Sequence, residues 1–189
     1  MMWAWKIGPA IACGNTVVIK TAETTPLSAL VAAEMIVEAG FPPGVINVIT
    51  GYGNIAGSSL SRHMDVDKVA FTGSTAVGRT ILKDAASTNL KKVTLELGGK
   101  SPNVVFNDAN LDRAVEWSAI GVFANMGQNC CAGTRIFVQS GIYDKFVQKM
   151  KEHVKKLVIG PPEDEKTTHG AQVSKSQLER ILGYVPITC

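Results

Sequence analysis

The stretch that decides the fold is Val69-Ala70-Phe71-Thr72-Gly73-Ser74-Thr75-Ala76-Val77-Gly78. It joins a short apolar strand pattern to a helical pattern through a turn that begins at a glycine. Strand-to-helix connections of this kind are typical of βαβ units. They also place backbone N–H groups at a helix N-terminus, where a phosphate can bind. The glycine spacing matches neither G-x-G-x-x-G nor a Walker loop, so taken alone it is more often simple turn chemistry.

The same alternation of short strands and helices continues on both sides of this stretch. Strands are predicted over 16–19, 45–49, 69–71, 93–96, 103–106 and 136–138, with helical patterns between them. Strands of this length separated by helices predict parallel pairing, because parallel strands need a crossover connection. The predicted class is therefore α/β: a Rossmann-like parallel sheet with flanking helices, followed by part of a second α/β domain. The glycine pair at 98 and 99 predicts the boundary, with residues 1–98 in the first domain and 99–189 in the second.

Composition excludes several classes of protein. The chain has 189 residues, 46% hydrophobic and 19% charged, which is typical of a folded globular protein rather than a disordered one. A net charge of +3 is too small to indicate nucleic-acid binding. The apolar opening, residues 1–13, is shorter than a membrane span and lacks a basic leader. We therefore expect no membrane partner, and we interpret this opening as a buried segment.

The cysteines and histidines do not form a metal-binding pattern. The four cysteines show no C-x-x-C spacing, and the three histidines lie far apart in the sequence. We expect no metal site. Two of the cysteines are adjacent and do not easily bridge each other, so the pattern is typical of a reducing compartment with free thiols.

Two glycine-rich stretches carry a carboxylate and, further along the chain, a thiol. Met126-Gly127-Gln128-Asn129-Cys130-Cys131-Ala132-Gly133 sets a thiol in a glycine-bounded loop, and Glu96-Leu97-Gly98-Gly99 sets a carboxylate at the end of a predicted strand. Singly, most cysteines are small buried hydrophobes and most glutamates are solvated surface groups. Together they supply the nucleophile and the base of covalent thioester chemistry.

Two charged residues follow the first predicted strand. Lys20 and Glu23 would stand at the carboxyl edge of the sheet, where open α/β folds bind ligands. Each of them alone is more often an ordinary loop charge. Whether Lys20 and Glu23 bind a ligand can be decided only together with the other motifs.

At this point the residues carry a resemblance to the aldehyde dehydrogenase family, over almost the whole chain to about Tyr184. The matching pieces are Val18-Ile19-Lys20-Thr21-Ala22-Glu23, Glu38-Ala39-Gly40-Phe41-Pro42-Pro43-Gly44-Val45, Phe71-Thr72-Gly73-Ser74, Leu95-Glu96-Leu97-Gly98-Gly99-Lys100-Ser101-Pro102 and Gly127-Gln128-Asn129-Cys130. Their order and spacing make the series far more specific than any single glycine motif.

The resemblance implies a role for each matching residue. Cys130 is the nucleophile, Cys131 its inert neighbour, and Glu96 the general base. Lys20 and Glu23 hydrogen-bond the adenosine ribose of NAD. The diphosphate channel of the cofactor is lined by Gly53, Gly73, Ser74 and Gly78. Glu23 favours NAD over NADP, because a carboxylate at the ribose hydroxyls repels a 2′-phosphate.

The implied reaction is oxidation of an aldehyde to a carboxylic acid with NAD, through a thiohemiacetal and then a thioester on Cys130. The first domain is then part of the dinucleotide-binding domain and the second part of the catalytic domain. Members of the family are homo-oligomers, and the resemblance implies that this chain lacks the oligomerisation strands. It also implies that the chain lacks an oxyanion-hole asparagine and a nicotinamide-ribose glutamate. We therefore expect an incomplete, weakly active or inactive fragment.

Two alternatives follow from the same residues. Cys130 can be acylated by an activated ester without any hydride step, which would make the chain a cofactor-free thiol esterase. Alternatively, the chain is a non-catalytic remnant that binds NAD, or that binds a partner through unpaired sheet edges. Free thiols are consistent with the cytoplasm or the mitochondrion, and no targeting signal is visible.

Overall fold

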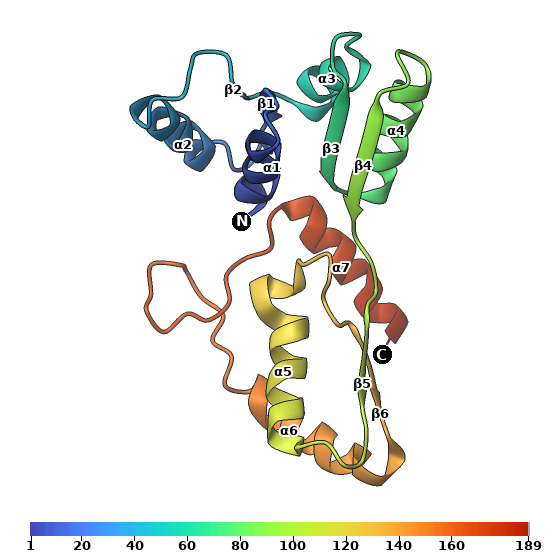
Figure 1. The fold of residues 1–189 in the computed structure, drawn as a ribbon. Helices are drawn as coiled ribbons and strands as arrows, with labels where there is room; N and C mark the ends of the chain where they lie inside the picture. Colours follow the sequence, from blue (N-terminus) through green and yellow to red (C-terminus); the bar gives the residue numbers. More distant parts are fainter. Residues whose placement is uncertain (189) are drawn as a thin grey trace. The chain divides into compact units, whose positions relative to one another are not determined.

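The computed structural model describes the backbone of residues 1–188 and the side chains of residues 1–185. The chain divides into two compact units, and the first comprises Met1–Leu97. The second begins at Gly98. The predicted boundary, between residues 98 and 99, lies one residue after this division. Figure 1 shows the elements of each unit along the chain.

The first unit combines two pairs of parallel strands with helices. Strand β1 (Val17–Lys20) pairs with β2 (Ile46–Ile49), and β3 (Lys68–Gly73) pairs with β4 (Lys92–Leu97). The helices are α1 (Met2–Ala12), α2 (Leu27–Glu38), α3 (Ser58–Arg62) and α4 (Thr75–Ala86), with a short π-helical turn, η1, at Gly53–Gly57. The α/β class with parallel strand pairing is confirmed.

The expected single sheet is not what the described residues form. β1 with β2 and β3 with β4 are separate two-stranded ladders, and neither ladder is hydrogen-bonded to the other within residues 1–188. The alternation of strand and helix predicts parallel pairing, but it does not specify which strands are neighbours, since strand order is a tertiary property.

The interpretation of residues 1–13 as a buried segment is wrong. The segment forms α1, of which only Ile7 is buried, and Trp5 is 56% exposed. A helix that is apolar all round must be covered on every side to be buried. The described residues cover only part of its surface.

Close contact between α4 and β4 fixes the position of α4, the helix that follows the strand-to-helix turn within residues 69–78. A Cβ atom added at Gly78 would lie 3.0 Å from Cδ2 of Leu97 and 3.4 Å from Cδ1 of Leu95. Gly78 therefore allows α4 to lie directly against the strand that carries Glu96. The glycine has a packing reason in addition to the cofactor role that the family resemblance implies.

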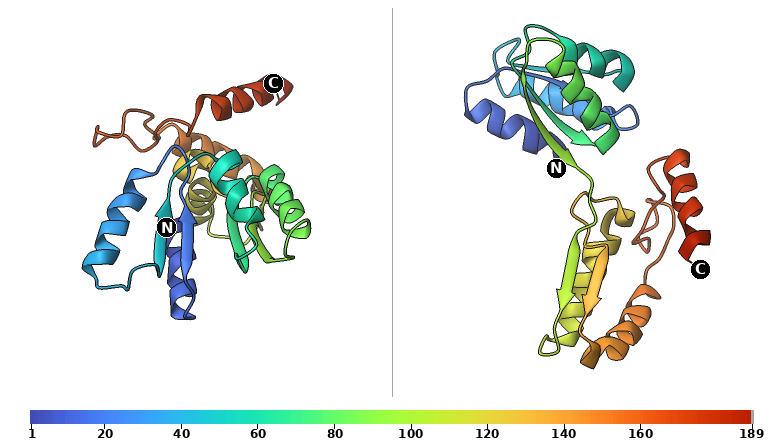
Figure 2. Two further views of the ribbon diagram at one scale, coloured as in Figure 1. Left: turned by 90° about the horizontal axis from the view of Figure 1, so that it is seen from above. Right: turned by 90° about the vertical axis from the view of Figure 1, so that its right-hand side faces the viewer.

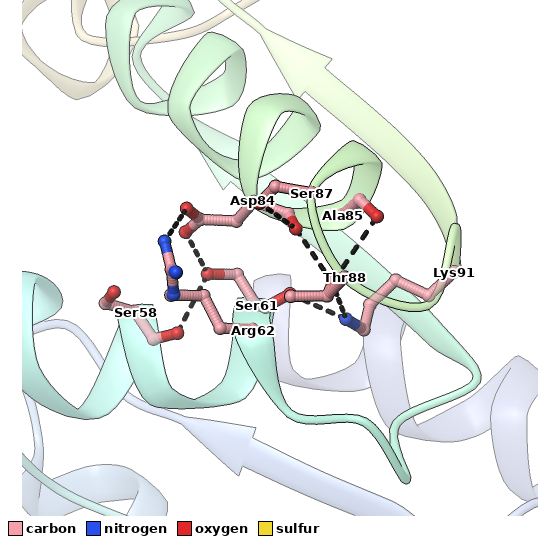
Figure 3. Close-up of polar contacts among 8 residues, drawn as sticks. All are labelled: Ser58, Ser61, Arg62, Asp84, Ala85, Ser87, Thr88 and Lys91. Atoms are coloured by element: carbon pink, nitrogen blue, oxygen red, sulfur yellow. Dashed lines mark hydrogen bonds and ion pairs between the residues drawn. The ribbon is translucent and has the colours of Figure 1, made fainter.

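A buried polar cluster joins α3 to α4 (Figure 3). The Asp84 carboxylate accepts a 2.6 Å hydrogen bond from Ser61 Oγ and a 3.2 Å bond from Arg62. Lys91 donates to the Ser61 carbonyl at 2.7 Å and to Thr88 Oγ1 at 3.1 Å. Buried charges are tolerated when their hydrogen bonds are satisfied, as they are here. The cluster thereby fixes α3 against the C-terminal half of α4.

The second unit packs two helices on one parallel ladder, and the right-hand view of Figure 2 shows this ladder with its helices. Strand β5 (Pro102–Val105) pairs with β6 (Arg135–Val138). Helix α5 (Leu111–Phe123) connects the two strands in the sequence, and α6 (Tyr143–Val154) comes after β6. Short 3₁₀ turns lie at Ala124–Gly127 (η2) and Ser140–Ile142 (η3). The buried core consists of Val105, Val115 and Phe146. Apolar residues of β6 and both helices pack around this core.

The chain ends in a helix that the sequence patterns do not predict. Helix α7 spans Lys175–Thr188, and Cys189, one of the four cysteines considered above, lies outside the described residues. Among the described residues, no helix is both long and apolar enough to cross a membrane. In the same part of the chain, no cluster of three or more His, Cys, Asp and Glu side chains could hold a metal.

Candidate active site

Lys20 lies at the carboxyl end of β1 and is held by the backbone of two loops. Its ammonium donates to the Thr21 carbonyl at 2.6 Å and to the Gly51 carbonyl at 3.0 Å. Its side chain is only 15% exposed. An ammonium has three donors, so these two bonds leave one for a further acceptor. Lys20 is therefore a fixed donor at the edge of the β1–β2 ladder.

Glu23 lies beside Lys20 and is tied to the turn after β2. Glu23 Oε1 is 3.6 Å from Lys20 Nζ and accepts a 2.5 Å hydrogen bond from the Gly53 amide. Hydrogen bonds from the backbone N–H groups of Glu23 itself and of Gly53 lower the pKa of the Glu23 carboxyl, and Lys20 adds to this shift. The structure thus brings together Lys20, Glu23 and Gly53, although the family resemblance assigns Gly53 to the diphosphate channel with Gly73, Ser74 and Gly78. A cavity of about 140 Å³ adjoins them, lined by Thr21, Ala22, Glu23, Pro26, Thr50, Gly51 and Tyr52.

This arrangement predicts how acid affects the Gly53 turn. Because the folded-state pKa of Glu23 is lowered, its stabilising contribution is present above the ordinary glutamate pKa and is lost as the pH falls through the folded pKa. We expect the chemical shift of the Gly53 amide proton to titrate with a midpoint below about 4.3, the ordinary value for glutamate. An NMR titration of this amide proton measures the midpoint. Glu23→Gln should abolish the titration. A midpoint at or above the ordinary glutamate pKa would contradict the lowered pKa of Glu23.

The second group of expected cofactor residues lies where β3 leads into α4. Ser74 is the N-cap residue, and its Oγ accepts a 3.3 Å hydrogen bond from the Val77 amide. The preceding Gly73 lies against the Phe71 ring, since an added Cβ would approach the ring within 2.5 Å. The first N–H groups of a helix have no intrahelical acceptor. This end of α4 therefore presents donors and a positive partial charge to an anion.

Glu96 is exposed on β4, in register with Thr72 of β3. Lys6 of α1 is close enough to interact with it electrostatically. Partial burial lowers the pKa of Lys6, and the negative charge of Glu96 opposes that shift. Lys6 and Glu96 are thus oppositely charged groups that interact through their electric fields.

Cys130 follows a strained left-handed turn. Three consecutive residues have positive φ: Asn125 at 52°, Met126 at 55° and Gly127 at 73°. Left-handed conformation costs a non-glycine residue about 1–2 kcal/mol, and asparagine tolerates it better than methionine. Strain of this kind persists only where surrounding contacts impose it.

Hydrogen bonds within the loop hold this turn. Asn125 Nδ2 donates to the Gln128 carbonyl at 3.1 Å, and Asn129 Nδ2 donates to the Ala124 carbonyl at 2.8 Å. Cys130 is half-buried, whereas the adjacent Cys131 is exposed. The carbonyl of Cys130 also lies 3.8 Å from the position of a Cβ added at Gly99. The two neighbouring thiols therefore have different surroundings.

Each expected site residue thus has a defined local position. Lys20, Glu23 and Gly53 form one cluster, and Gly73, Ser74 and Gly78 belong to the start of α4. Glu96 belongs to the first unit and Cys130 to the second. Lys6 was missed by the sequence analysis. Its signal was available, because it is the single charged residue in the otherwise apolar helix Met2–Ala12.

Comparison with known proteins identifies the family. The sequence model of the aldehyde dehydrogenase family matches residues 1–188. An aldehyde dehydrogenase from Davidiella tassiana is 69% identical over 185 residues, which cover 98% of this chain and 37% of that protein. The human mitochondrial aldehyde dehydrogenase is 56% identical over 185 residues, again 98% of this chain and 36% of that protein.

Solved structures agree in fold. The NAD⁺ complex of an aldehyde dehydrogenase from Bacillus cereus is 46% identical and superposes with a TM-score of 0.95. The match covers 98% of this chain and 38% of that one. The chain thus spans less than two-fifths of the length of these relatives. The resemblance found in the motifs is confirmed, and the chain belongs to the aldehyde dehydrogenase family.

Proposed function

We propose that this chain contributes to the NAD-dependent oxidation of an aldehyde to a carboxylic acid, with Cys130 as nucleophile and Glu96 as general base. The observation that carries the proposal is the cluster of Lys20, Glu23 and the Gly53 amide at the carboxyl ends of β1 and β2. Open α/β folds bind nucleotides at this edge. Similarity to the NAD⁺ complex from Bacillus cereus supports the same cofactor.

The residues of this cluster fit the adenosine ribose of NAD. Lys20 supplies a donor and Glu23 an ionised acceptor, and the 3.6 Å between their charged atoms suits a vicinal diol that bonds to both. Because the pKa of Glu23 is lowered, its carboxylate is ionised at neutral pH. It therefore accepts from a 2′-hydroxyl and repels a 2′-phosphate. This charge is the basis for proposing NAD rather than NADP.

The N-terminus of α4 fits the diphosphate. Ser74 caps the helix through its hydroxyl, and Gly73 precedes it without a side chain. Gly78 keeps α4 against β4, which fixes the direction of the helix N-terminus. Backbone N–H groups and the helix dipole together favour an anion here. When bound, NAD supplies the hydride acceptor that no side chain can offer.

Cys130 makes the aldehyde carbon tetrahedral. Its thiolate adds to the carbonyl and forms a thiohemiacetal. Collapse of the oxyanion to a C=O can then expel hydride, which a bound NAD would accept, and leaves a thioester on Cys130. Glu96 then removes a proton from a water molecule, and the hydroxide equivalent attacks the thioester carbonyl. The carboxylic acid leaves and the Cys130 thiolate is restored.

A second candidate function is hydrolysis of activated esters by Cys130 without NAD. It is favoured by the half-buried position of Cys130 in a turn that is fixed by side-chain hydrogen bonds. Acylation and deacylation need only the thiol, the base and water. The two candidates differ in whether NAD binds and whether NADH forms.

The chain spans 37% of the length of the Davidiella relative, and we expect slower aldehyde turnover from these 189 residues than from a full-length enzyme. Fast NADH formation by the purified 189-residue chain would contradict this expectation. The proposed compartment is the cytoplasm or the mitochondrion, and the human relative is a mitochondrial protein by name.

Calorimetric titration with NAD tests the proposal. We expect Glu23→Gln to weaken NAD binding about tenfold or more, since a hydrogen bond to a charged group contributes about 1.5–3 kcal/mol. The same change should narrow the preference for NAD over NADP, because the repulsion of a 2′-phosphate is removed. Glu38→Gln, a change of the same type at an exposed position of α2, is the matched control.

Each result has a defined meaning. Equal NAD affinity in Glu23→Gln and the unaltered chain would refute the role of Glu23. If no NAD binds but an activated ester acylates Cys130, the esterase function replaces the dehydrogenase function. Binding of NAD without any acylation of Cys130 would leave an NAD-binding remnant.

A further inference from the structure

A segment of the second unit far from Cys130 in sequence is hydrogen-bonded to the turn that precedes this cysteine. This segment, residues 167–173, connects the loop after α6 to helix α7, and we call it the tether. It contacts the turn at Phe123, Met126 and Gln128. These contacts lie before, within and after the left-handed turn at residues 125–127.

His169 makes the first contact. Its Nε2 lies 2.9 Å from the carbonyl oxygen of Phe123, the last residue of α5. A carbonyl can only accept, so His169 Nε2 carries the proton in this bond. The last carbonyls of a helix have no intrahelical donor, and His169 supplies one. The point at which α5 ends, and the left-handed turn begins, is thereby fixed.

Gln128 and Gln172 make the remaining contacts. Gln128 Oε1 accepts a 3.1 Å hydrogen bond from the Val173 amide, and Gln172 Nε2 makes a longer contact of 3.5 Å with the Met126 carbonyl. The second contact is at the limit of hydrogen-bond length and carries little weight. Gln128 lies two residues before Cys130, so its bond to Val173 acts close to the thiol.

The tether is itself anchored. Its Thr168 and His169 amides donate to the Val158 carbonyl at 2.9 and 3.0 Å, and the Gly160 amide donates to the His169 carbonyl at 3.1 Å. Thr168 Oγ1 accepts from the Val158 amide at 2.9 Å. A segment held in this way can impose strain on a neighbouring turn, because its own position is fixed by several bonds. A loosely attached segment would move instead.

We propose that the tether positions the nucleophile: His169 and the Gln128–Val173 bond hold the left-handed turn that sets the orientation and surroundings of Cys130. His169 and Gln128 are positioning residues, since they act through the turn. The proposal rests on the proposed role of Cys130, but it concerns a different property. It explains why a turn with two non-glycine residues at positive φ persists directly before the thiol.

The test compares the two adjacent thiols within one molecule. The 189-residue chain is alkylated with iodoacetamide over a range of pH, and the rates at Cys130 and Cys131 are resolved by mass spectrometry. In the unaltered chain we expect different rates and different pH profiles, since Cys130 is half-buried and Cys131 is exposed. In His169→Ala and Gln128→Ala, the Cys130 rate and pH profile should approach those of Cys131.

Two further variants separate positioning from general destabilisation. His169→Gln retains an amide N–H near the position of Nε2 and should restore the rate difference. Gln139→Ala removes a comparable bond, from the Asn107 amide to Gln139 Oε1 at 2.8 Å, beyond the opposite end of β6. It should leave the rate ratio unchanged. The midpoint of thermal unfolding is measured for every variant, so that a loss of folding is recognised.

Two outcomes would overturn the proposal: equal alkylation of both thiols in the unaltered chain, or an unchanged ratio in His169→Ala. If His169→Gln does not restore the rate difference, the role of His169 as a donor to the Phe123 carbonyl is refuted. The result is independent of acyl transfer. If the rates converge as expected but no substrate acylates Cys130, the tether positions a cysteine that is not the nucleophile, and only the proposed function fails.

Discussion

Cys130→Ala is expected to lower both aldehyde oxidation and ester hydrolysis by this chain about 1,000-fold or more, which corresponds to a loss of about 4 kcal/mol of transition-state stabilisation. The reason is that alanine has no group that can form the covalent bond to the carbonyl carbon, so neither a thiohemiacetal nor a thioester can form. Remaining donors of the loop can still polarise a carbonyl, which is why some residual rate is expected. NADH absorbance and release of nitrophenolate from an activated ester measure the two reactions.

Cys131→Ala is the matched control, because it removes the same chemical group from the next residue. We expect its rates to stay within about twofold of the unaltered chain, as is usual for an exposed side chain that takes no part in the reaction. Mass spectrometry adds a direct readout, since an acyl adduct should be found on Cys130 alone. An adduct that persists in Cys130→Ala, or an equal loss of rate in both variants, would refute the assignment of the nucleophile.

The second large effect concerns stability. Phe146→Ala should destabilise the second unit by about 3–5 kcal/mol, the range observed when a buried aromatic side chain is truncated. Phe146 of α6 is 3% exposed and forms the buried core with Val105 and Val115. Truncation removes the side chain that joins α6 to β5 and α5. A small domain has only about 5–15 kcal/mol of total stability, so this loss removes much of it.

Hydrogen exchange followed by mass spectrometry measures this effect in each unit separately. In Phe146→Ala, peptides from β5, β6 and α5 should lose protection, whereas peptides from β1 to β4 should exchange as before. Tyr143→Ala removes an aromatic side chain from the same helix at a 52% exposed position, and we expect it to change protection little. Equal loss of protection in both units would contradict the division at residue 97.

Much of the local structure was predictable because it depends on neighbouring residues. The run from Val69 to Gly78 specifies a strand, a capped turn and a helix, and β3 and α4 follow that order. Ser74 caps α4 since a serine hydroxyl can accept from the amide three residues later. The motifs containing Lys20, Glu96 and Cys130 were specific enough to indicate the family that the comparison confirms.

Other features could not be predicted, because they depend on contacts between distant residues. Residues 1–13 are apolar, and an apolar pattern shows that a helix can be buried, not that the described chain covers it. The relation between Lys6 and Glu96 arises only when α1 lies near β4. The cluster around Asp84 depends in the same way on the packing of α3 against α4.

The sequence by itself determined the α/β class, the parallel pairing, the family and the candidate roles of Cys130, Glu96, Lys20 and Glu23, since each rests on residue type and local spacing. The tertiary structure decided which strands pair, how the Gly53 amide binds Glu23, and how the glycine-bounded cysteine loop is held. The last of these depends on a tether that is more than forty residues away in sequence. Only folding brings His169 to the end of α5, because no local pattern specifies a hydrogen bond between distant segments.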